Sequence, residues 1–399
     1  MQKHVAADPA QQIKATTLPI LVALSVAHFL NDLIQSLIPA IYPIIKQAHG
    51  LDFGQIGMIT FTFQMTASLF QPLVGNYTDR HPQPYSLVAG MASTLVGLIV
   101  LSQAATYPML IVGAALVGLG SSIFHPEATR MAGVASGGRH GLAQSLFQIG
   151  GQGGAAAGPL IAALVVVPNG QGSLGWFSLV ALLAIMVMVH VGRWYARELE
   201  RIAARPDRVT KETRPLIAFA IPIAILITVM FSKNAYFASL QSFYTFYLMD
   251  RFGVTVAESQ KLLFLFLVSS PIGLMIGGPL GDKIGRRRMI LVSIVGAAPF
   301  ALLLPYVNLF WTAVLAFLIG AIISSAFSSI LVYAIELLPG RVGMIGGLFY
   351  GLAFGLGALG AAILGEVADR TSIMTVYQIC AFLPLMGLLA VFLPKVGTR

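Results

Sequence analysis

The sequence predicts an all-α membrane protein that crosses the bilayer many times and is built from two similar halves. Of its 399 residues, 57% are hydrophobic and only 10% are charged, and the mean hydropathy is +0.84. A soluble domain carries charge on roughly 25% of its residues. The apolar residues fall into twelve segments, and motifs of the first half recur in the second. We therefore expect twelve transmembrane helices, arranged as two parallel six-helix repeats around a central cavity.

Each of the twelve segments is roughly 19–35 residues long, which lets a helix rising about 1.5 Å per residue cross the hydrocarbon core. The segments are residues 17–46, 53–76, 84–104, 107–131, 141–167, 174–195, 215–249, 259–281, 288–305, 309–337, 342–366 and 373–394. The longest polar connection separates the sixth segment from the seventh. We expect an N-terminal six-helix bundle in 1–195, a cytosolic linker in 196–213 and a C-terminal six-helix bundle in 214–399.

Basic residues determine the orientation that we expect. With the N-terminus in the cytosol, 19 of the 24 Lys and Arg residues lie in cytosolic segments, 4 lie in outer loops and Lys233 lies within a span. Cytosolic loops carry an excess of Lys and Arg, so we expect both termini in the cytosol. The net charge of +9 comes from these short loops and predicts no nucleic acid partner. Cys380 stands alone in an apolar segment, so we expect no disulfide framework and no Cys-rich metal site. We also expect no other metal and no cofactor.

Motifs of the two halves are related by a fixed offset. Gly75 and Asp79 lie 203 residues before Gly278 and Asp282. The same offset relates Asn31 to Asn234 and residues 121–124 to residues 324–327, and an offset of 202 relates Gly158 to Gly360. Parallel six-helix repeats of this kind, related by an axis along the membrane normal, are a transporter architecture.

The most specific motif is the connection after the eighth segment, Gly-Pro-Leu-Gly-Asp-Lys-Ile-Gly-Arg-Arg-Arg, which begins at Gly278 and contains Asp282 and Arg286. It resembles the loop signature of the major facilitator superfamily, which implies the major facilitator fold. The acid of such a loop can sit against a helix N-terminus or a basic neighbour and brace one of two arrangements of the halves. The alternative is a charge cluster that only fixes the topology.

The first-half copy of this motif keeps Gly75, Asp79 and Arg80 and then departs from the pattern at residues 81–84. Gly75 allows close helix approach. We expect any charge latch in this half to rest on Asp79 and Arg80.

The fifth segment carries Gly154, Gly158 and Pro159 in a pattern that resembles the antiporter signature of the same superfamily. Alanines at 162–163 replace the two glycines that end that signature. The resemblance implies that these residues take part in the conformational change. Small residues at four-residue spacing also let helix backbones approach closely, and plain packing is the alternative.

The whole chain resembles the fosmidomycin resistance protein group of this superfamily. The resemblance is carried by residues 28–36, 121–127, 137–145, 243–247 and 336–341. It implies export of a small phosphonate drug coupled to inward proton flow, and it does not imply the physiological substrate. We expect a multi-pass protein of the bacterial inner membrane whose partners are a small-molecule substrate, protons and lipid, and which acts as a monomer.

In this superfamily the first, fourth, seventh and tenth helices line the cavity, a placement carried over by resemblance. On the first, His28, Asp32 and Gln35 share one face at i, i+4, i+7 spacing. Asp32 lies about halfway along its segment, so a proton-carrying role is expected, with His28 and Gln35 as substrate contacts. The alternative is an Asp that is hydrogen-bonded to neighbouring helices.

On the fourth helix, His125 and Glu127 are further candidates for proton coupling. They lie about 200° apart around the helix axis, so only one of them can face the cavity. Glu127 can instead form an ion pair with Arg130 one turn later, and His125 can be a structural polar contact.

On the seventh helix, Lys233 lies near the middle of its segment and is a candidate for binding an anionic substrate. An ion pair between Lys233 and Asp32 is the structural alternative. Further candidate substrate contacts are Tyr236, Tyr244, Tyr247, Gln64 and Gln148. Glutamines within spans often hold helices together instead.

These observations favour a proton-coupled exporter of small drugs or metabolites that works by alternating access. A symporter that imports a small organic anion through the Lys233 site is the second hypothesis. A membrane enzyme or receptor is a third class, but the sequence contains no His-Glu-x-x-His zinc motif, serine nucleophile elbow or Walker loop. We expect a transporter rather than an enzyme.

Overall fold

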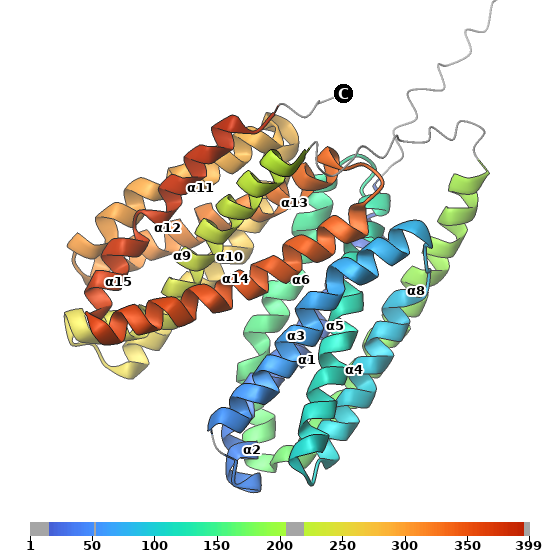
Figure 1. Cartoon of the computed structure of the whole chain (residues 1–399), viewed down its shortest axis with the longest axis horizontal. Helices are drawn as coiled ribbons and strands as arrows, with labels where there is room; N and C mark the ends of the chain where they lie inside the picture. The colour runs from blue at the N-terminus through green and yellow to red at the C-terminus, as the bar shows by residue number, and fades with distance from the viewer. Residues whose placement is uncertain (1–15, 52, 205–218, 395–399) are drawn as a thin grey trace, which may run out of the picture.

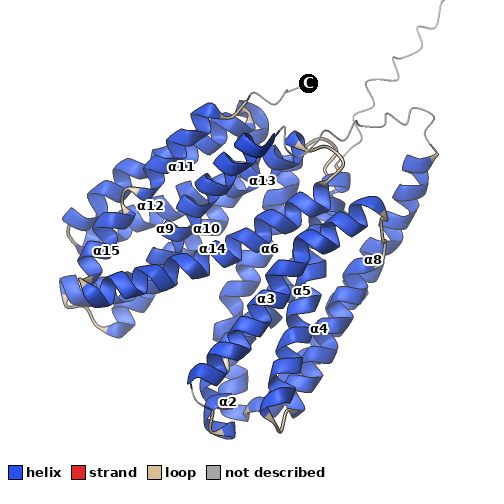
Figure 2. Cartoon of the chain, in the orientation of Figure 1, coloured by secondary structure: helices blue, strands red, loops and turns tan. Residues whose placement is uncertain are grey.

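The computed structural model describes residues 16–51, 53–204 and 219–394, which form helices and short connections without a strand in these ranges (Figure 2). The first half contains α1 (Leu18–Ala40), α2 (Tyr42–His49), α3 (Phe53–Arg80), α4 (Ser86–Gln103), α5 (Tyr107–Ala135), α6 (His140–Ile161), η2 (Ala162–Val166), α7 (Val167–Asn169), η3 (Gln171–Phe177) and α8 (Ser178–Ala203). The second half contains α9 (Ala220–Phe252), α10 (Val256–Ile284), α11 (Arg286–Leu303), η5 (Leu304–Tyr306), α12 (Leu309–Ser324), α13 (Ala326–Leu337), α14 (Val342–Arg370), α15 (Ile373–Cys380) and η6 (Leu383–Phe392).

Helical stretches coincide with all twelve predicted segments, and nine spans in the described part of the chain are long and apolar enough to cross a membrane. The tenth segment is divided at Ser325 into α12 and α13, and the first is divided at Ile41, just after Pro39. Helix α8 continues through Ala203, so the linker predicted at 196–213 begins inside a helix. The rest of that linker falls within 205–218, outside the described residues.

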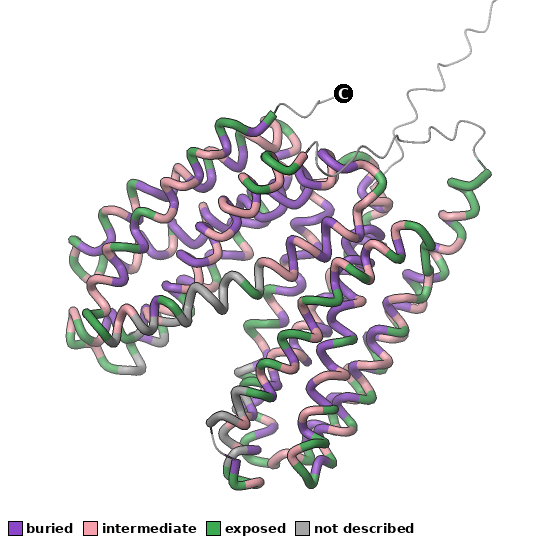
Figure 3. The backbone as a smooth tube through the Cα atoms, viewed as in Figure 1, coloured by how far each residue is buried: buried purple, intermediate pink, exposed green. Residues whose placement is uncertain are grey.

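Two groups of helices, α1–α8 and α9–α15, converge at one end of the molecule and diverge toward the other (Figure 1). Buried residues lie inside each group and where the groups meet (Figure 3). One apolar cluster fills the first group and continues into the second through α9, α11, α13 and α14. A second cluster, around Tyr244 and Ile319, lies within the second group. The end at which α3 ends and α14 begins is called the Asp79 end below.

Glycines set the distance between α3 and α14 near the Asp79 end. A Cβ atom added to Gly75 would collide with the backbone of Gly343. Two turns further along α14, a Cβ at Gly351 would lie 2.9 Å from the carbonyl oxygen of Ser68. At Gly355 nothing lies within 4 Å of such an atom. The two helices are therefore in backbone contact at the Asp79 end and separate beyond Gly351.

Helices α6 and α10 make the equivalent contact on the other side. Gly278 packs against the carbonyl of Gly141 and the side chain of Ser145, where a Cβ atom would overlap both. The Ser145 and Ser328 hydroxyls lie 2.9 Å apart across the same contact, and both residues are buried. The halves thus close on each other at the Asp79 end along two helix pairs.

We expect Gly75→Ala to open the Asp79 end, because overpacking of this kind costs about 1–3 kcal/mol and the halves can relieve it by separating. The matched control is Gly133→Ala, since an added Cβ at Gly133 meets nothing within 4 Å. The reporter is Ser145→Cys, labelled with a membrane-impermeant maleimide. Labelling should be roughly 5- to 150-fold faster with Gly75→Ala than with Gly133→Ala, and equal rates would contradict the steric role of Gly75.

Candidate functional site

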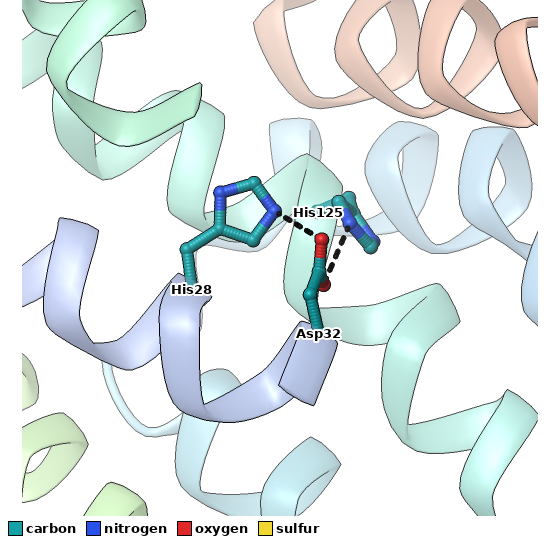
Figure 4. Close-up of side chains that lie close together, drawn as sticks. All are labelled: His28, Asp32 and His125. Atoms are coloured by element: carbon teal, nitrogen blue, oxygen red, sulfur yellow. Dashed lines mark ion pairs between the residues drawn. The ribbon is translucent and has the colours of Figure 1, made fainter. Parts of the chain in front are cut away.

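A cluster of three ionisable side chains lies where α1 and α5 cross (Figure 4). His28 and Asp32 stand one turn apart on α1, and His28 Nε2 is 3.2 Å from Asp32 Oδ2. His125 of α5 directs its Nε2 toward the other carboxylate oxygen, Oδ1, at 3.8 Å. Both imidazoles are buried, and the Asp32 side chain is 15% exposed. The carboxylate is therefore the member of the cluster that water reaches.

Backbone carbonyls fix the orientation of both imidazole rings. His28 Nδ1 lies 2.8 Å from the carbonyl oxygen of Phe147, and His125 Nδ1 lies 3.1 Å from that of Ser121. A carbonyl oxygen only accepts hydrogen bonds, so the Nδ1 of each ring is the donor and each Nε2 is left to face Asp32. Two Nε2 atoms thus face one carboxylate. A proton on either Nε2 would lie between an imidazole and an Asp32 oxygen.

Side-chain amides of α1 hold the Asp32 carboxylate in place. Asn31 Nδ2 donates to Asp32 Oδ1 at 2.9 Å, and Gln35 Nε2 lies 3.5 Å from the same oxygen. Gly151 of α6 leaves the room that the cluster needs, because a Cβ there would collide with the His28 ring and lie 2.8 Å from Asp32 Oδ2. Asp32 Oδ1 is therefore already approached by two amide donors of α1.

One donor atom from each of His28, Asp32 and His125 lies within 4.8 Å of the others, a spacing that suits shared protons and also a bound cation. His28 and Asp32 already lie at the separation of a charge-assisted hydrogen bond, and a proton-coupling role for the cluster stays a prediction. The sequence-based expectation of no metal stays a prediction.

Lys233 of α9 is a buried cation. Its Nζ lies 3.3 Å from Asn234 Oδ1 and 5.3 Å from the centre of the Phe327 ring. Among the residues that the structure describes, no carboxylate oxygen lies within 4.0 Å of this nitrogen. The Asp32–Lys233 ion pair is therefore not formed in this conformation. Burying an uncompensated Lys charge within a membrane costs at least about 2.5–3.5 kcal/mol, and a bound anion would offset this cost.

Aromatic rings lie between Lys233 and the cluster of His28, Asp32 and His125. The Phe327 ring, over which Lys233 Nζ lies, is 5.4 Å from the Tyr350 ring. The Tyr350 ring is in turn 5.0 Å from the imidazole of His125. Phe327 belongs to α13 and Tyr350 to α14, so the second half contributes both rings between the cation and the cluster.

The predicted tyrosines pack inside the second half. Tyr244 donates to the carbonyl of Thr312 at 3.4 Å, and Tyr247 donates to that of Leu304 at 3.5 Å. Tyr236 is buried in the same apolar cluster. A substrate role for these residues stays a prediction, and in this conformation their side chains support α9 from within its own bundle.

The three predicted glutamines have different surroundings. Gln35 reaches Asp32, as described above. Gln148 of α6 accepts a hydrogen bond from the Tyr350 hydroxyl at 2.8 Å, which places it beside the cluster and on the contact between the halves. Gln64 is exposed on α3, and none of the cluster's contacts in the described residues involves it.

Glu127 lies on the other side of α5 from His125. Its Oε1 is 3.0 Å from Arg130 NH1, and its Oε2 accepts from the Ser86 hydroxyl at 2.8 Å. This is the ion-pair alternative that the spacing of Glu127 and Arg130 indicated. The structure therefore brings His125, and not Glu127, to Asp32.

Asp79 joins the first half to the N-terminus of α14. Its two carboxylate oxygens accept from the backbone amides of Gly343 at 2.8 Å and Met344 at 2.9 Å. Arg130 donates to Asp79 at 2.9 Å and also to the hydroxyl and carbonyl of Thr78. A carboxylate at a helix N-terminus satisfies free amide groups and interacts favourably with the helix dipole.

Asp282 makes the corresponding contact from the second half to α6. Its oxygens accept from the amides of Gly141 and Leu142, both at 3.0 Å. Arg286 lies 2.5 Å from Asp282, and its Nε is 3.6 Å from Glu336. Each half thus presents an acid, supported by an arginine, to the first turn of a helix in the other half.

These two contacts are related by the sequence repeat. Asp79 precedes Asp282 by 203 residues, and the amides of Gly141–Leu142 precede those of Gly343–Met344 by 202. The pair is called the double latch below. It holds the halves together at the Asp79 end, beside a cavity of about 1350 Å³ that opens between them and is lined by several arginines.

The remaining predicted gating residues have local roles. Arg80 is exposed at the end of α3, and Arg130 takes the place beside Asp79 that was expected for Arg80. Gly154 and Gly158 pack against Phe29 and Ser36 of α1, so they hold α6 within its own half. The side chain of Pro159 lies outside the described residues.

Sequence reasoning missed two residues that shape the cluster. Tyr350 approaches from the other half, and its signal was its 202-residue offset from Gln148. Gly151 was overlooked because it does not belong to the four-residue glycine spacing of Gly154 and Gly158, which drew attention as a resemblance to the antiporter signature. Neither contact follows from one helix alone, since each joins residues more than 100 positions apart.

Comparison with known proteins places this chain among transporters. A family model described as the Major Facilitator Superfamily matches residues 24–343 and 225–398. The chain is similar to the Fosmidomycin resistance protein of Escherichia coli (strain K12), with 53% identity over 391 residues, 98% of this chain and 96% of that protein. It is 40% identical over 388 residues to the uncharacterized MFS-type transporter YfnC of Bacillus subtilis (strain 168), covering 96% of this chain and 95% of that one.

Among solved structures, the chain is similar to the Escherichia coli fucose:proton symporter FucP, with a TM-score of 0.73 and 16% identity over 96% of this chain and 100% of that one. A second FucP structure, in the outward conformation, gives a TM-score of 0.73 at 17% identity, covering 95% and 99% of the two chains. At this identity the likeness concerns the fold alone. The resemblance expected from the loop motif is confirmed, and so is the expectation of a transporter rather than an enzyme. The chain belongs to the Major Facilitator Superfamily, with the all-helical fold of its membrane transporters.

Proposed function

We propose that this chain is a proton-coupled antiporter that exports small phosphonates and related organic anions from the bacterial cytosol by alternating access. The observation that carries the proposal is the presence of two separate charged sites. One is the buried cation Lys233, and the other is the His28–Asp32–His125 cluster. The name of the Escherichia coli relative supports fosmidomycin as a substrate. A phosphonate would supply the counter-charge that Lys233 lacks among the described residues.

Antiport requires that proton and substrate oppose each other's binding, and Asp32 Oδ1 offers a direct way. With one proton shared between His28 and Asp32, this oxygen accepts a hydrogen bond from a hydroxyl group on the substrate. A second proton, taken up from outside at Oδ1 or at His125, removes the acceptor and releases the substrate. Linkage is reciprocal, so substrate loaded from the cytosol expels the proton. Because Lys233 and Asp32 are not paired, each is available to its own ligand.

We assign the Asp79 end to the cytosol, because the Lys and Arg excess lies there. In this arrangement the double latch closes the cytosolic side, and the proton cluster takes up protons from outside. The arginine-lined cavity beside the latch then lies at the cytosolic mouth, where positive charge raises the local concentration of an anionic substrate.

A symporter is the second candidate, and one observation favours it. A protonated cluster adds positive charge to a site that already holds Lys233, so proton and anion would promote each other's binding if the substrate made no hydrogen bond to Asp32. The two functions differ in the direction in which an inward proton gradient drives the substrate.

Everted membrane vesicles separate these functions. When the vesicle interior is acidified, an antiporter accumulates radiolabelled fosmidomycin inside, and dissipating the gradient with a protonophore abolishes the uptake. A symporter instead accumulates substrate in right-side-out vesicles with an acidic exterior. Uptake only in the right-side-out vesicles would contradict the proposed export.

We expect Asp282→Asn to raise the population that is open at the cytosolic side, because an amide offers one acceptor where the carboxylate offers two and carries no charge toward the α6 dipole. The loss of one such charge-assisted contact is worth roughly 1–3 kcal/mol, or 5- to 150-fold in the equilibrium. The measurement is maleimide labelling of Ser145→Cys in everted vesicles. If neither labelling nor transport changes, Asp282 has only the topological role.

A further inference from the structure

Tyr350 is a residue of the second half whose polar contact lies in the first half. Its hydroxyl donates to Gln148 Oε1 at 2.8 Å, from α14 to α6. The two residues are 202 positions apart, the offset of the repeat, so this hydrogen bond joins equivalent positions across the axis between the halves. Tyr350 is 2% exposed and Gln148 is 7% exposed. The bond is therefore an internal contact that exists only while the halves are closed here.

The ring of Tyr350 covers the proton cluster. Its centre lies 5.0 Å from that of the His125 imidazole and 6.3 Å from the Phe147 ring, which stacks on His28 at 4.0 Å. Tyr350 stands about two turns from the start of α14, toward the middle of the helix, and His125 lies ten residues before the end of α5. The ring thus covers the His125 side of the cluster from the other half, about two turns from the Asp79 end.

The same helix carries the latch and this cover. The α14 amides of Gly343 and Met344 are held by Asp79, and Tyr350 follows about two turns later on continuous helix. A helix moves as a rigid element over this length, so release of Asp79 must also lift Tyr350 from His125 and Gln148. Closure of the latch and covering of the cluster are therefore one event.

We propose that Tyr350 is a positioning residue that seals the His28–Asp32–His125 cluster from the cytosolic side until the double latch opens. The inference rests on the proposed proton-coupled transport and adds the element that prevents protons from passing through without substrate. In the closed state a proton reaches Asp32 from outside but finds no water path onward past the ring. Gln148 holds the ring in place through the hydroxyl bond.

The test is the substrate-independent proton leak of Tyr350→Phe, which keeps the ring and loses the hydroxyl. Proteoliposomes with an imposed pH gradient and an internal pH dye measure proton entry without substrate. We expect a leak about fivefold above that of the unmodified protein, which corresponds to about 1 kcal/mol for one hydrogen bond. Tyr333→Phe is the matched control, because it removes a tyrosine hydroxyl bond, to the Pro394 carbonyl at 2.6 Å, that lies within the second half.

A double-mutant cycle assigns the effect to the contact. Gln148→Leu should raise the leak as Tyr350→Phe does, and the double variant should leak no more than either single variant. In everted vesicles, a water-soluble carbodiimide should modify Asp32 faster in both variants, as read by mass spectrometry of its peptide. A leak and a modification rate equal to those of Tyr333→Phe would overturn the proposal.

The outcome is distinguishable from failure of the proposed function. If the unmodified protein shows no gradient-driven substrate movement in either direction, the proposed transport fails. If it transports normally and Tyr350→Phe neither leaks nor exposes Asp32, only the sealing role fails. Gradient-independent substrate exchange checks that Tyr350→Phe is folded, because exchange needs the binding site and not a tight seal.

Discussion

Asp32→Asn is expected to abolish proton-driven efflux and leave the protein inserted and folded. The amide keeps the shape of the side chain and its contact with Asn31. It cannot take up the second proton at Oδ1, and it offers no negative charge to hold that proton on His125. Without that proton, the outside gradient no longer displaces the substrate. Efflux from loaded proteoliposomes under an imposed pH gradient should fall to the level of protein-free vesicles, whereas gradient-independent exchange of substrate should persist.

Asp250→Asn is the matched control, because Asp250 is an exposed carboxylate near the end of α9. It should leave both efflux and exchange unchanged. Normal gradient-driven efflux in Asp32→Asn would refute the coupling role of Asp32 and move it to Glu127, the other carboxylate predicted for proton coupling, which is buried.

Lys233→Ala is expected to weaken substrate binding by roughly 10- to 150-fold, because a hydrogen bond to a charged group contributes about 1.5–3 kcal/mol. The effect should depend little on ionic strength, since Lys233 is buried and salt screens buried pairs weakly. The measurement is equilibrium binding of radiolabelled fosmidomycin to the purified protein.

Lys261→Ala removes an exposed lysine from α10 and serves as the control with the same loss of charge. It should leave the dissociation constant unchanged. If Lys233→Ala binds fosmidomycin as tightly as the control, Lys233 does not bind the anion. The two variants also separate proton coupling from substrate binding. Asp32→Asn should affect coupling to the gradient, and Lys233→Ala should affect affinity for the substrate.

Local properties of the chain determined what could be predicted. The hydrophobic run lengths predicted twelve helical segments, because a helix in lipid satisfies its own backbone and needs only enough apolar length. The i, i+4 spacing of His28 and Asp32 placed them on one face, and their 3.2 Å contact follows from helix geometry alone. The position of Asp282 within a recognisable loop indicated a contact with a helix N-terminus or a basic neighbour, and Asp282 makes both contacts.

Only the tertiary structure decided which of several local possibilities is realised. The spacing of His125 and Glu127 showed that one of them must face away, but the packing of α5 against α1 decided that His125 meets Asp32. Lys233 could have paired with Asp32, and the rings of Phe327 and Tyr350 lie between them instead.

The latch and the cover on the cluster depend on residues that are distant in sequence. Arg130, and not the adjacent Arg80, supports Asp79, because α5 brings its side chain into the buried contact while Arg80 ends α3 in an exposed position. Tyr350 meets Gln148 only because two repeats close on each other. Helical periodicity fixes the direction of a side chain relative to its own helix, but the partner it meets depends on how helices pack, and that is set by the whole fold.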